Sequence, residues 1–204
     1  SEIRLSPVLG NFSDDVDERI VQESFNFKLV CDILPNVTLF TTDEKERLDV
    51  AHKAFLANMS TLSDVEYRKE MERLGVDLSW KSSQIEGNTY SLLETERLLK
   101  EKETAQGKTK EEAVMLLNHK DALDFILDYP DYLKELTVRR IEDIHSILTK
   151  ELGVGSGIRK RRVGITGTNY RPLDNEFQIR EALEDTCTLI NGKENVFEKA
   201  LLAL

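Results

Sequence analysis

The residues best suited to chemistry lie at the predicted end of a helix, in the segment Ser82-Ser83-Gln84-Ile85-Glu86-Gly87-Asn88. Gly87 and Asn88 are residue types that end a helix by adopting positive φ. Glu86 would then lie at the carbonyl end of the helix dipole, which disfavours a negative charge by about 0.3 kcal/mol or more. A carboxylate in that place gains from a cationic partner, so Glu86 is a candidate binding residue. The alternative is a solvated glutamate before an ordinary helix cap.

A second candidate is the glycine-rich stretch from Gly153 to Pro172, which interrupts the helical pattern. Four positive charges gather in Arg159-Lys160-Arg161-Arg162, where they could attract phosphate or an acidic partner. The alternative is a solvated basic loop. The segments 163–165 and 168–170 flank Gly167 in the way that strands flank a turn, and we therefore expect a short β-hairpin.

Other catalytic patterns are missing from the sequence. It contains no Gly-x-x-x-x-Gly-Lys loop, no His-Glu-x-x-His and no Cys-x-x-Cys motif. His119 and His145 fall on predicted helices, and we interpret both as satisfied structural histidines. Cys31 and Cys187 lack metal-ligand spacing and are interpreted as reduced, buried thiols. The residues alone therefore predict a mainly helical protein without an assembled catalytic site.

Helices must position these residues, because Ser, Thr or Asn recurs three places before Glu or Gln, which is the pattern of a helix-capping box. The five pairs are Thr41 with Glu44, Ser63 with Glu66, Ser91 with Glu94, Thr109 with Glu112, and Asn175 with Gln178. Apolar residues follow at helical spacing, and we expect these stripes to form the core. The stripes are Leu48, Ala51 and Phe55; Tyr67, Met71, Leu74, Leu78 and Ile85; Leu116, Leu117, Leu123, Ile126 and Leu127; and Ile141, Ile144, Ile147 and Leu148.

Length and composition bound the class of protein. The 204 residues, 40% of them hydrophobic, are enough for one domain with its own core and a small extension. We place a partly helical N-terminal extension at residues 1–61 and the helical domain at residues 62–204. The net charge of −10 argues against non-specific nucleic-acid binding. Because no stretch approaches the roughly 18 apolar residues of a membrane span, we expect a cytoplasmic protein without membrane contact.

Several segments carry a resemblance to one protein family. Ser82, three residues, Glu86 and then Gly87 is similar to an inhibitory motif of Ser or Thr, three residues, Glu, then Gly or Asn. Three further segments resemble the stretch after this motif, the next helix and the flap of the same family, and they are residues 86–99, 117–126 and 163–172. In these segments, which lie in residues 62–204, the chain resembles the Fic/DOC (Fic domain) family.

The resemblance implies a fold and a reaction. The fold would be a mainly α, Fic-like helical bundle with a short β-hairpin flap. The activity would be protein adenylylation, in which AMP passes from ATP, with Mg²⁺, to a hydroxyl of a target protein. Glu86 would pair with the second arginine of the family's signature loop and occupy the γ-phosphate position, so that ATP binds in a poorly aligned pose. Ser82, one helical turn earlier, would hold Glu86 or the local backbone, and Gly87 would complete the motif.

The flap would bind the target, because an edge strand at the active site pairs with an extended target segment. The flap residues are Val163, Gly164, Ile165, Thr166 and Gly167.

The family's catalytic signature, His-x-Phe-x-Asp/Glu-Gly-Asn-Gly/Lys-Arg-x-x-Arg, does not occur in residues 1–204. We expect it beyond Leu204, which makes this chain inactive alone and the full-length protein an autoinhibited adenylyltransferase. One alternative is a non-catalytic, Fic-like binding or scaffold module that presents the hairpin to a partner. Another is an enzyme that transfers phosphate or phosphocholine. The resemblance also allows a homodimer.

Overall fold

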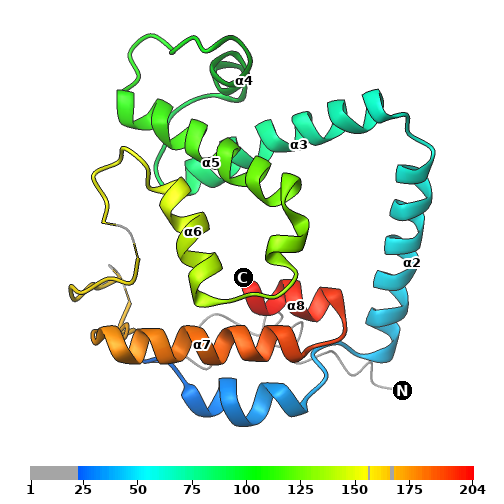
Figure 1. The fold of residues 1–204 in the computed structure, drawn as a ribbon, viewed down its shortest axis with the longest axis vertical. Helices are drawn as coiled ribbons and strands as arrows, with labels where there is room; N and C mark the ends of the chain where they lie inside the picture. The colour runs from blue at the N-terminus through cyan, green and yellow to red at the C-terminus, as the bar shows by residue number, and fades with distance from the viewer. Residues whose placement is uncertain (1–22, 156, 166–167) are drawn as a thin grey trace. The chain divides into compact units, whose positions relative to one another are not determined.

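The computed structural model describes residues 23–155, 157–165 and 168–204, and in these residues the protein is mainly helical, as predicted (Figure 1). The α-helices are α2 (Thr42–Ser60), α3 (Asp64–Ile85), α4 (Leu92–Glu101), α5 (Lys110–Asp128), α6 (Val138–Leu148), α7 (Glu176–Gly192) and α8 (Val196–Ala203). The short π- and 3-10 helices are η2 (Leu29–Ile33), η3 (Leu34–Asn36) and η4 (Pro130–Leu133). These elements belong to two compact units, which are described separately below.

One unit comprises residues 59–135 and 139–157. At its centre α3 packs most extensively against α5, and α4 packs against both of these helices. Its apolar core combines residues from the turn after α3, from α4 and from α5. The core residues are Tyr90, Leu98, Ala113 and Leu116. Burial of side chains of this size is the main term that stabilises the unit.

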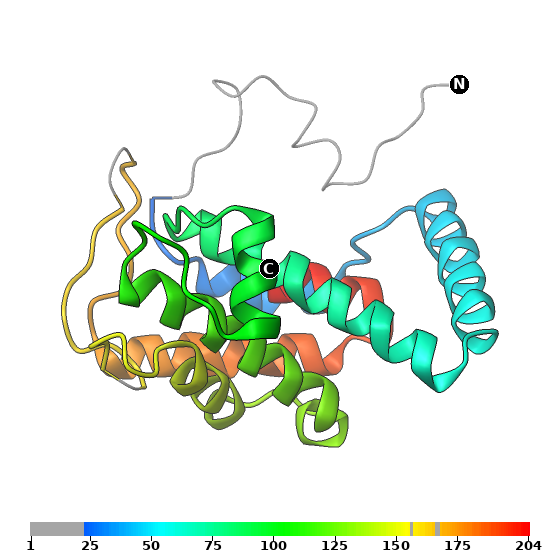
Figure 2. The same cartoon turned by 90° about the horizontal axis from the view of Figure 1, so that it is seen from above.

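The other unit comprises residues 1–58, 136–138 and 158–204. In its described part η2 and η3 contact α7, and η2 lies alongside α7 in both views (Figures 1 and 2). α8 follows α7 and packs against it. The buried apolar residues of the described part come mostly from α7 and are Leu39, Val138, Ala182, Cys187, Leu189 and Ile190.

The predicted helix starts are confirmed where the structure describes them. Ser63, Ser91 and Thr109 each form a complete capping box with the glutamate three residues later. The Thr41 hydroxyl and Glu44 exchange the same contacts before α2. Asn175 caps α7 by accepting a hydrogen bond from the Phe177 N–H at 2.9 Å, without the predicted help of Gln178.

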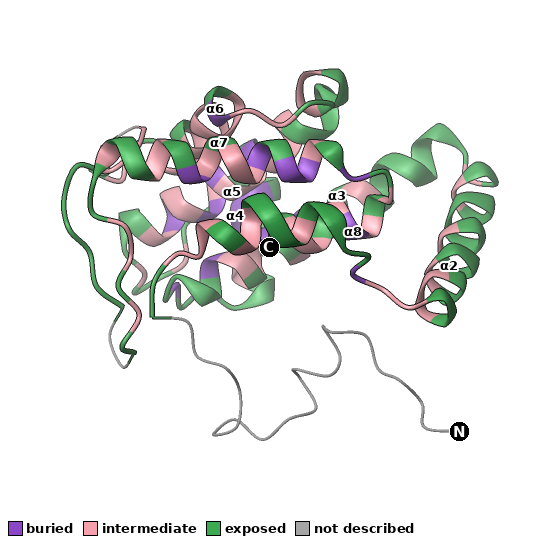
Figure 3. Cartoon of the chain, turned by 90° about the horizontal axis from the view of Figure 1, so that it is seen from below, coloured by how far each residue is buried: buried purple, intermediate pink, exposed green. Residues whose placement is uncertain are grey.

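The prediction that all apolar stripes form the core is wrong for α2 and α3, and also for the last turn of α5, where Ile126 and Leu127 are exposed. α2 has no buried residue, and Figure 3 draws its ribbon only in the colours of intermediate and exposed residues; Phe55 is among the exposed ones. Four of the five stripe residues on α3 are exposed, namely Tyr67, Leu74, Leu78 and Ile85.

α3 instead buries a face of smaller residues, which are Gly75, Val76, Ser79 and Ser83. Small residues bring α3 close to α5: a Cβ on Gly75 would lie 3.1 Å from the Cε of Lys120. Close approach of the two backbones therefore outweighs the burial of larger side chains on the other face of α3.

The predicted β-hairpin is not seen in the described part of residues 153–172. Residues 163–165 and 168–170 form no strand. A single parallel bridge instead joins Ser24 and Arg171. Within the described residues, no helix has both the length and the hydropathy needed to cross a membrane.

Candidate functional site

The turn after α3 places Glu86 at the end of the helix. Glu86 is the last residue with near-helical backbone (φ −81°, ψ 6°), and Gly87 takes φ 89°, as predicted. The Gly87 N–H donates to the carbonyl of Gln84 at 3.0 Å, and the Asn88 N–H donates to that of Ser83 at 2.9 Å. These two bonds are those of a Schellman motif, in which a left-handed glycine satisfies the last carbonyls of a helix.

Asn88 has a role that the sequence did not suggest. It was expected to share the left-handed conformation, but it is not among the described residues with positive φ. Its side chain is buried, donates through Nδ2 to the carbonyl of Glu112 at 2.8 Å and accepts the Tyr90 N–H at 3.0 Å. Because a buried amide needs its hydrogen bonds satisfied, these contacts fix the turn against α5.

Glu112 holds the next residue of the turn. One of its carboxylate oxygens accepts the Thr89 N–H at 2.8 Å and the Thr89 hydroxyl at 2.5 Å. The other accepts the Thr109 N–H at 2.9 Å and the Thr109 hydroxyl at 3.2 Å. Donation from the Thr109 backbone, and next from the Thr89 hydroxyl and backbone, lowers the pKa of Glu112 to about 2. One carboxylate therefore caps α5 and anchors the turn that carries Glu86.

The Glu112 contacts predict a dependence of stability on pH. Because the pKa is lowered in the folded state, the stabilisation is complete above the unfolded value of 4.5 and is lost as the pH falls towards 2. We expect Glu112→Gln to lower the free energy of unfolding at pH 7. The difference in this free energy between the wild type and the variant, called the gap below, should become smaller as the pH falls from 4.5 to 2. Urea unfolding at several pH values, followed by Trp80 fluorescence, measures this gap. A gap that stays constant over this range would contradict the role of the ionised carboxylate.

The Glu86 side chain itself is exposed, and its carboxylate forms no hydrogen bond or ion pair within residues 23–155, 157–165 and 168–204. Ser82 is half-buried, and its carbonyl accepts the Glu86 N–H at 3.4 Å. In the same ranges the Ser82 hydroxyl forms no hydrogen bond to the Glu86 carboxylate. The anchored turn thus presents an unpaired negative charge at the carbonyl end of α3, where the helix dipole disfavours it.

The two helical histidines differ. His119 Nδ1 lies 2.9 Å from the carbonyl of Met115 and 3.4 Å from the hydroxyl of Ser83, which agrees with a structural role between α3 and α5. His145 Nδ1 is buried without a hydrogen-bond partner among the described residues, so the prediction of a satisfied histidine is wrong there.

The stretch predicted as a flap belongs to the other unit. Val163 and Ile165 are exposed, at 49% and 52% of their surface, and Gly164 is exposed as well. The N–H of Thr168 donates to the carbonyl of Ile165 at 3.3 Å. Thr166 and Gly167 lie outside the described residues. The chain here offers an accessible backbone with apolar side chains, without the predicted strand pairing.

Part of the basic run before this stretch is neutralised within the chain. Lys160 lies 3.5 Å from Glu176, and Arg162 lies 2.8 Å from Asp174. Two of the four charges are therefore engaged near the start of α7, which leaves less charge for a phosphate or an acidic partner than the sequence suggested.

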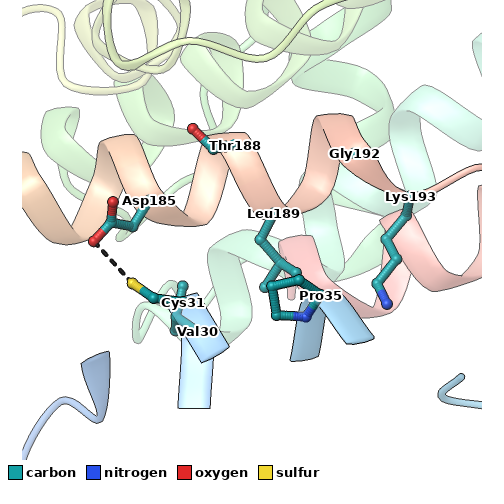
Figure 4. Close-up of a pocket in the computed structure, with 8 residues that line it drawn as sticks. All are labelled: Val30, Cys31, Pro35, Asp185, Thr188, Leu189, Gly192 and Lys193. Atoms are coloured by element: carbon teal, nitrogen blue, oxygen red, sulfur yellow. Dashed lines mark hydrogen bonds between the residues drawn. The ribbon is translucent and has the colours of Figure 1, made fainter. Parts of the chain in front are cut away.

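A cavity of about 370 Å³ lies between η2, η3 and α7 (Figure 4). Cys31 donates its thiol to the Asp185 carboxylate at 3.2 Å, and this bond raises the pKa of the thiol. A protonated thiol is a poor nucleophile. Cys31 is exposed, which corrects the predicted burial, while Cys187 is buried; both are free. Lys193, at the other end of the cavity, is engaged by the carbonyls of Leu34 and Val37.

Comparisons of the chain with protein-family models, with curated proteins and with solved structures found no match. The structure brings Ser82, Glu86 and Gly87 together in one anchored turn of one unit. It leaves Val163, Gly164 and Ile165 accessible in the other unit. The sequence identified Asn88 only as a helix-ending residue and Glu112 only as part of a capping box, and their contacts across the turn were missed because the partners are distant in sequence.

Proposed function

We propose that this chain is the regulatory and N-terminal part of a Fic-type protein adenylyltransferase in which Glu86 restrains transfer of AMP to a target hydroxyl. The observation that carries the proposal is the unpaired Glu86 carboxylate on a turn fixed by buried hydrogen bonds. A protein that only needed to end a helix at Gly87 gains nothing from a carboxylate there, since the dipole favours a cation. A guanidinium outside this chain is the partner that suits it best, because the pair is bidentate and charge-assisted.

The restraint follows from competition. A guanidinium paired with Glu86 cannot at the same time hold the γ-phosphate of ATP, so the nucleotide would bind without the alignment that in-line attack on the α-phosphorus requires. Pre-organisation strengthens this competition, because the turn is ordered before the pair forms and little further entropy is lost. Asn88 and Glu112 supply that order, and Ser82 contributes through its backbone carbonyl.

The residues of this chain do not fit the nucleotide or the metal that the proposed reaction uses. The sequence has no phosphate-binding loop. Among the described residues no group of three or more His, Cys, Asp or Glu side chains could hold a metal ion. The proposal therefore assigns the binding of ATP and Mg²⁺ to residues outside this chain.

The exposed stretch at Val163 and Ile165 supports target binding. An accessible backbone flanked by apolar side chains can add an extended target segment through main-chain hydrogen bonds. The proposed target is a protein in the cytoplasm, and neither a nucleic acid nor a membrane takes part in binding. The proposal is also compatible with a homodimer of this chain.

The experiment is an assay of AMP incorporation from ATP labelled at the α-phosphate, with Mg²⁺ and cell lysate. A polypeptide that carries this chain together with the catalytic signature is expected to label itself or a target protein. Residues 1–204 alone are expected to give background label, because they lack the base and the arginines of the signature. Incorporation by residues 1–204, or none by the folded longer polypeptide, would contradict the proposal.

The second candidate is a binding module without chemistry. It is favoured by the exposure of Val163 and Ile165 in a chain whose described residues assemble no catalytic group. The catalytic signature of the Fic family distinguishes the two candidate functions. An intact signature favours AMP transfer, whereas a degenerate signature in a protein that still binds its target favours the binding module.

A further inference from the structure

The cavity of about 370 Å³ between η2, η3 and α7 has mostly apolar walls. Val30 and Pro35 form the wall on the side of η2 and η3, and Leu189 points towards Pro35 from α7 (Figure 4). All lining residues belong to the unit that contains α7, and none of them belongs to the turn at Glu86 or to residues 163–165. The cavity is therefore separate from the residues of the proposed function.

A carboxylate lies at one end of the cavity. Asp185 extends from α7 to η2, where it accepts the thiol hydrogen of Cys31 at 3.2 Å, so the carboxylate lies between the two walls (Figure 4). Both residues line the cavity, and neither is buried: Cys31 is exposed and Asp185 is half-buried. The carboxylate is therefore accessible to a ligand in the cavity.

The Asp185 carboxylate has only a weak partner. Within residues 23–155, 157–165 and 168–204, the Cys31 thiol is the one group that donates to it, and no cation pairs with it. A thiol is a weak donor, and a carboxylate has about four acceptor sites, so most of its acceptor capacity is unused. The bond to Asp185 raises the pKa of Cys31 most, and the charges of Asp32 and Glu181 raise it further, which is the effect of a negative potential at this end of the cavity.

The cation at the other end of the cavity is already engaged. Nζ of Lys193 donates to the carbonyls of Leu34 and Val37 at 2.6 and 2.7 Å and lies 3.7 Å from the carboxylate of Glu198. An ammonium group has three donors, and these three acceptors account for all of them. Lys193 therefore has no donor left for an anion or for the carboxylate of a zwitterion.

We propose that this cavity binds a small organic amine in its protonated form, with the ammonium group at Asp185 and an apolar body between Pro35 and Leu189. An ammonium group would form charge-assisted hydrogen bonds with the carboxylate. The apolar walls favour a hydrocarbon or aromatic body, since a sugar or a nucleotide would leave most of its polar groups without partners. The volume is near the lower end of the range for ligand pockets and allows about one ring with a short chain.

The test uses phenethylamine as the probe and backbone amide chemical shifts of the full 204-residue chain as the readout, at neutral pH and physiological salt. Phenethylamine is expected to cause saturable shifts at Cys31, Asp185 and Leu189, with a dissociation constant of about a millimolar for so few atoms. Phenethyl alcohol has nearly the same shape without the charge and is expected to bind at least about tenfold more weakly.

Two variants locate the charge. Asp185→Asn keeps the shape of the side chain and is expected to weaken phenethylamine binding about tenfold or more. Glu184→Gln removes the same charge from the neighbouring exposed position of α7, which does not line the cavity, and should bind phenethylamine like the wild type.

Equal binding of phenethylamine and phenethyl alcohol to the wild type overturns the proposal, even if Asp185→Asn does not fold. Unchanged phenethylamine binding by folded Asp185→Asn also overturns it, as does an equal loss of binding in Asp185→Asn and Glu184→Gln. The same holds if these amides show no saturable shifts at about 20 mM phenethylamine.

Discussion

Replacing Glu86 with glycine is expected to raise the initial rate of AMP transfer severalfold or more in a polypeptide that carries this chain and the catalytic signature. The proposed pair with an arginine is lost, so the arginine is free to hold the γ-phosphate and align the α-phosphorus. Folding should change little. A glycine near a helix end costs only about 1 kcal/mol, and the removed charge opposes the helix dipole. The rate is measured at saturating ATP, because the effect lies in alignment and not only in affinity.

Two matched variants distinguish the effect of losing the Glu86 carboxylate from the effect of placing a glycine near the end of α3. Glu86→Gln keeps the shape of the side chain and removes its charge, so it should also raise the rate. Gln84→Gly places a glycine in the last turn of α3 at another exposed position and keeps Glu86, so it should transfer AMP at the wild-type rate. Equal rates for the wild type and for Glu86→Gly, with both proteins folded, would leave Glu86 as an ordinary helix-end residue.

The local signals in the sequence were sufficient for the helix ends. A capping box requires only residues three places apart, so Ser63, Ser91 and Thr109 could be assigned from spacing alone. Gly87 was also identifiable as a candidate for positive φ, because glycine takes this conformation without a steric cost. The position of Glu86 at the end of α3 was therefore predictable from the sequence.

What fixes the turn was not predictable in this way. Asn88 contacts the carbonyl of Glu112, which lies 24 residues away, and Thr89 contacts the carboxylate of the same residue. Both Asn88 and Gly87 suit a left-handed turn, and local preference cannot tell which of them instead serves as a buried link. The choice depends on where α5 lies, which is a tertiary property.

Periodicity also failed to choose the buried face of α3. Its apolar stripe and its stripe of small residues both recur at helical spacing, and the structure buries Gly75, Ser79 and Ser83. Helical spacing identifies faces, but it does not say whether close packing of small residues or burial of large ones prevails. The hairpin at residues 163–168 was likewise expected from turn-like composition, and its described residues form no strand. A strand also needs a partner, which composition does not supply.

Lys193, which follows α7, forms a buried ion pair with Glu198 of α8. Both residues also bind the backbone of residues 34–39, which lie far away in the sequence. The side chain of Lys193 is 9% exposed and that of Glu198 is 6% exposed, and their charged atoms lie 3.7 Å apart. Lys193 also donates to the carbonyls of Leu34 and Val37 at 2.6 and 2.7 Å. Glu198 accepts the N–H of Leu39 at 3.1 Å. The pair therefore attaches the segment after η2 to the C-terminal helices of this unit.

Replacing Lys193 with methionine is expected to lower the free energy of unfolding by about 3 kcal/mol. Methionine keeps the length of the aliphatic side chain. The buried carboxylate of Glu198, however, loses the more buried of its two lysine partners, and the carbonyls of Leu34 and Val37 lose their donor. Lys45, 3.5 Å from Glu198 and 34% exposed, compensates only in part, which places the loss at the lower end of the range for a broken buried pair. Urea unfolding followed by far-ultraviolet circular dichroism measures the change.

The controls for this last prediction distinguish a broken buried pair from the loss of any lysine. Lys100→Met breaks a pair with Glu96 at 2.7 Å in which both side chains are nearly half exposed, and it should cost less than about 1 kcal/mol because solvent already screens the charges. Lys193→Met combined with Glu198→Leu removes both buried charges and should recover part of the stability lost in Lys193→Met alone, since the largest cost of the single change is the charge that remains. If Lys193→Met is no more destabilising than Lys100→Met, the contacts with Leu34, Val37 and Glu198 do not hold this unit together, and its stability comes from the apolar face of α7.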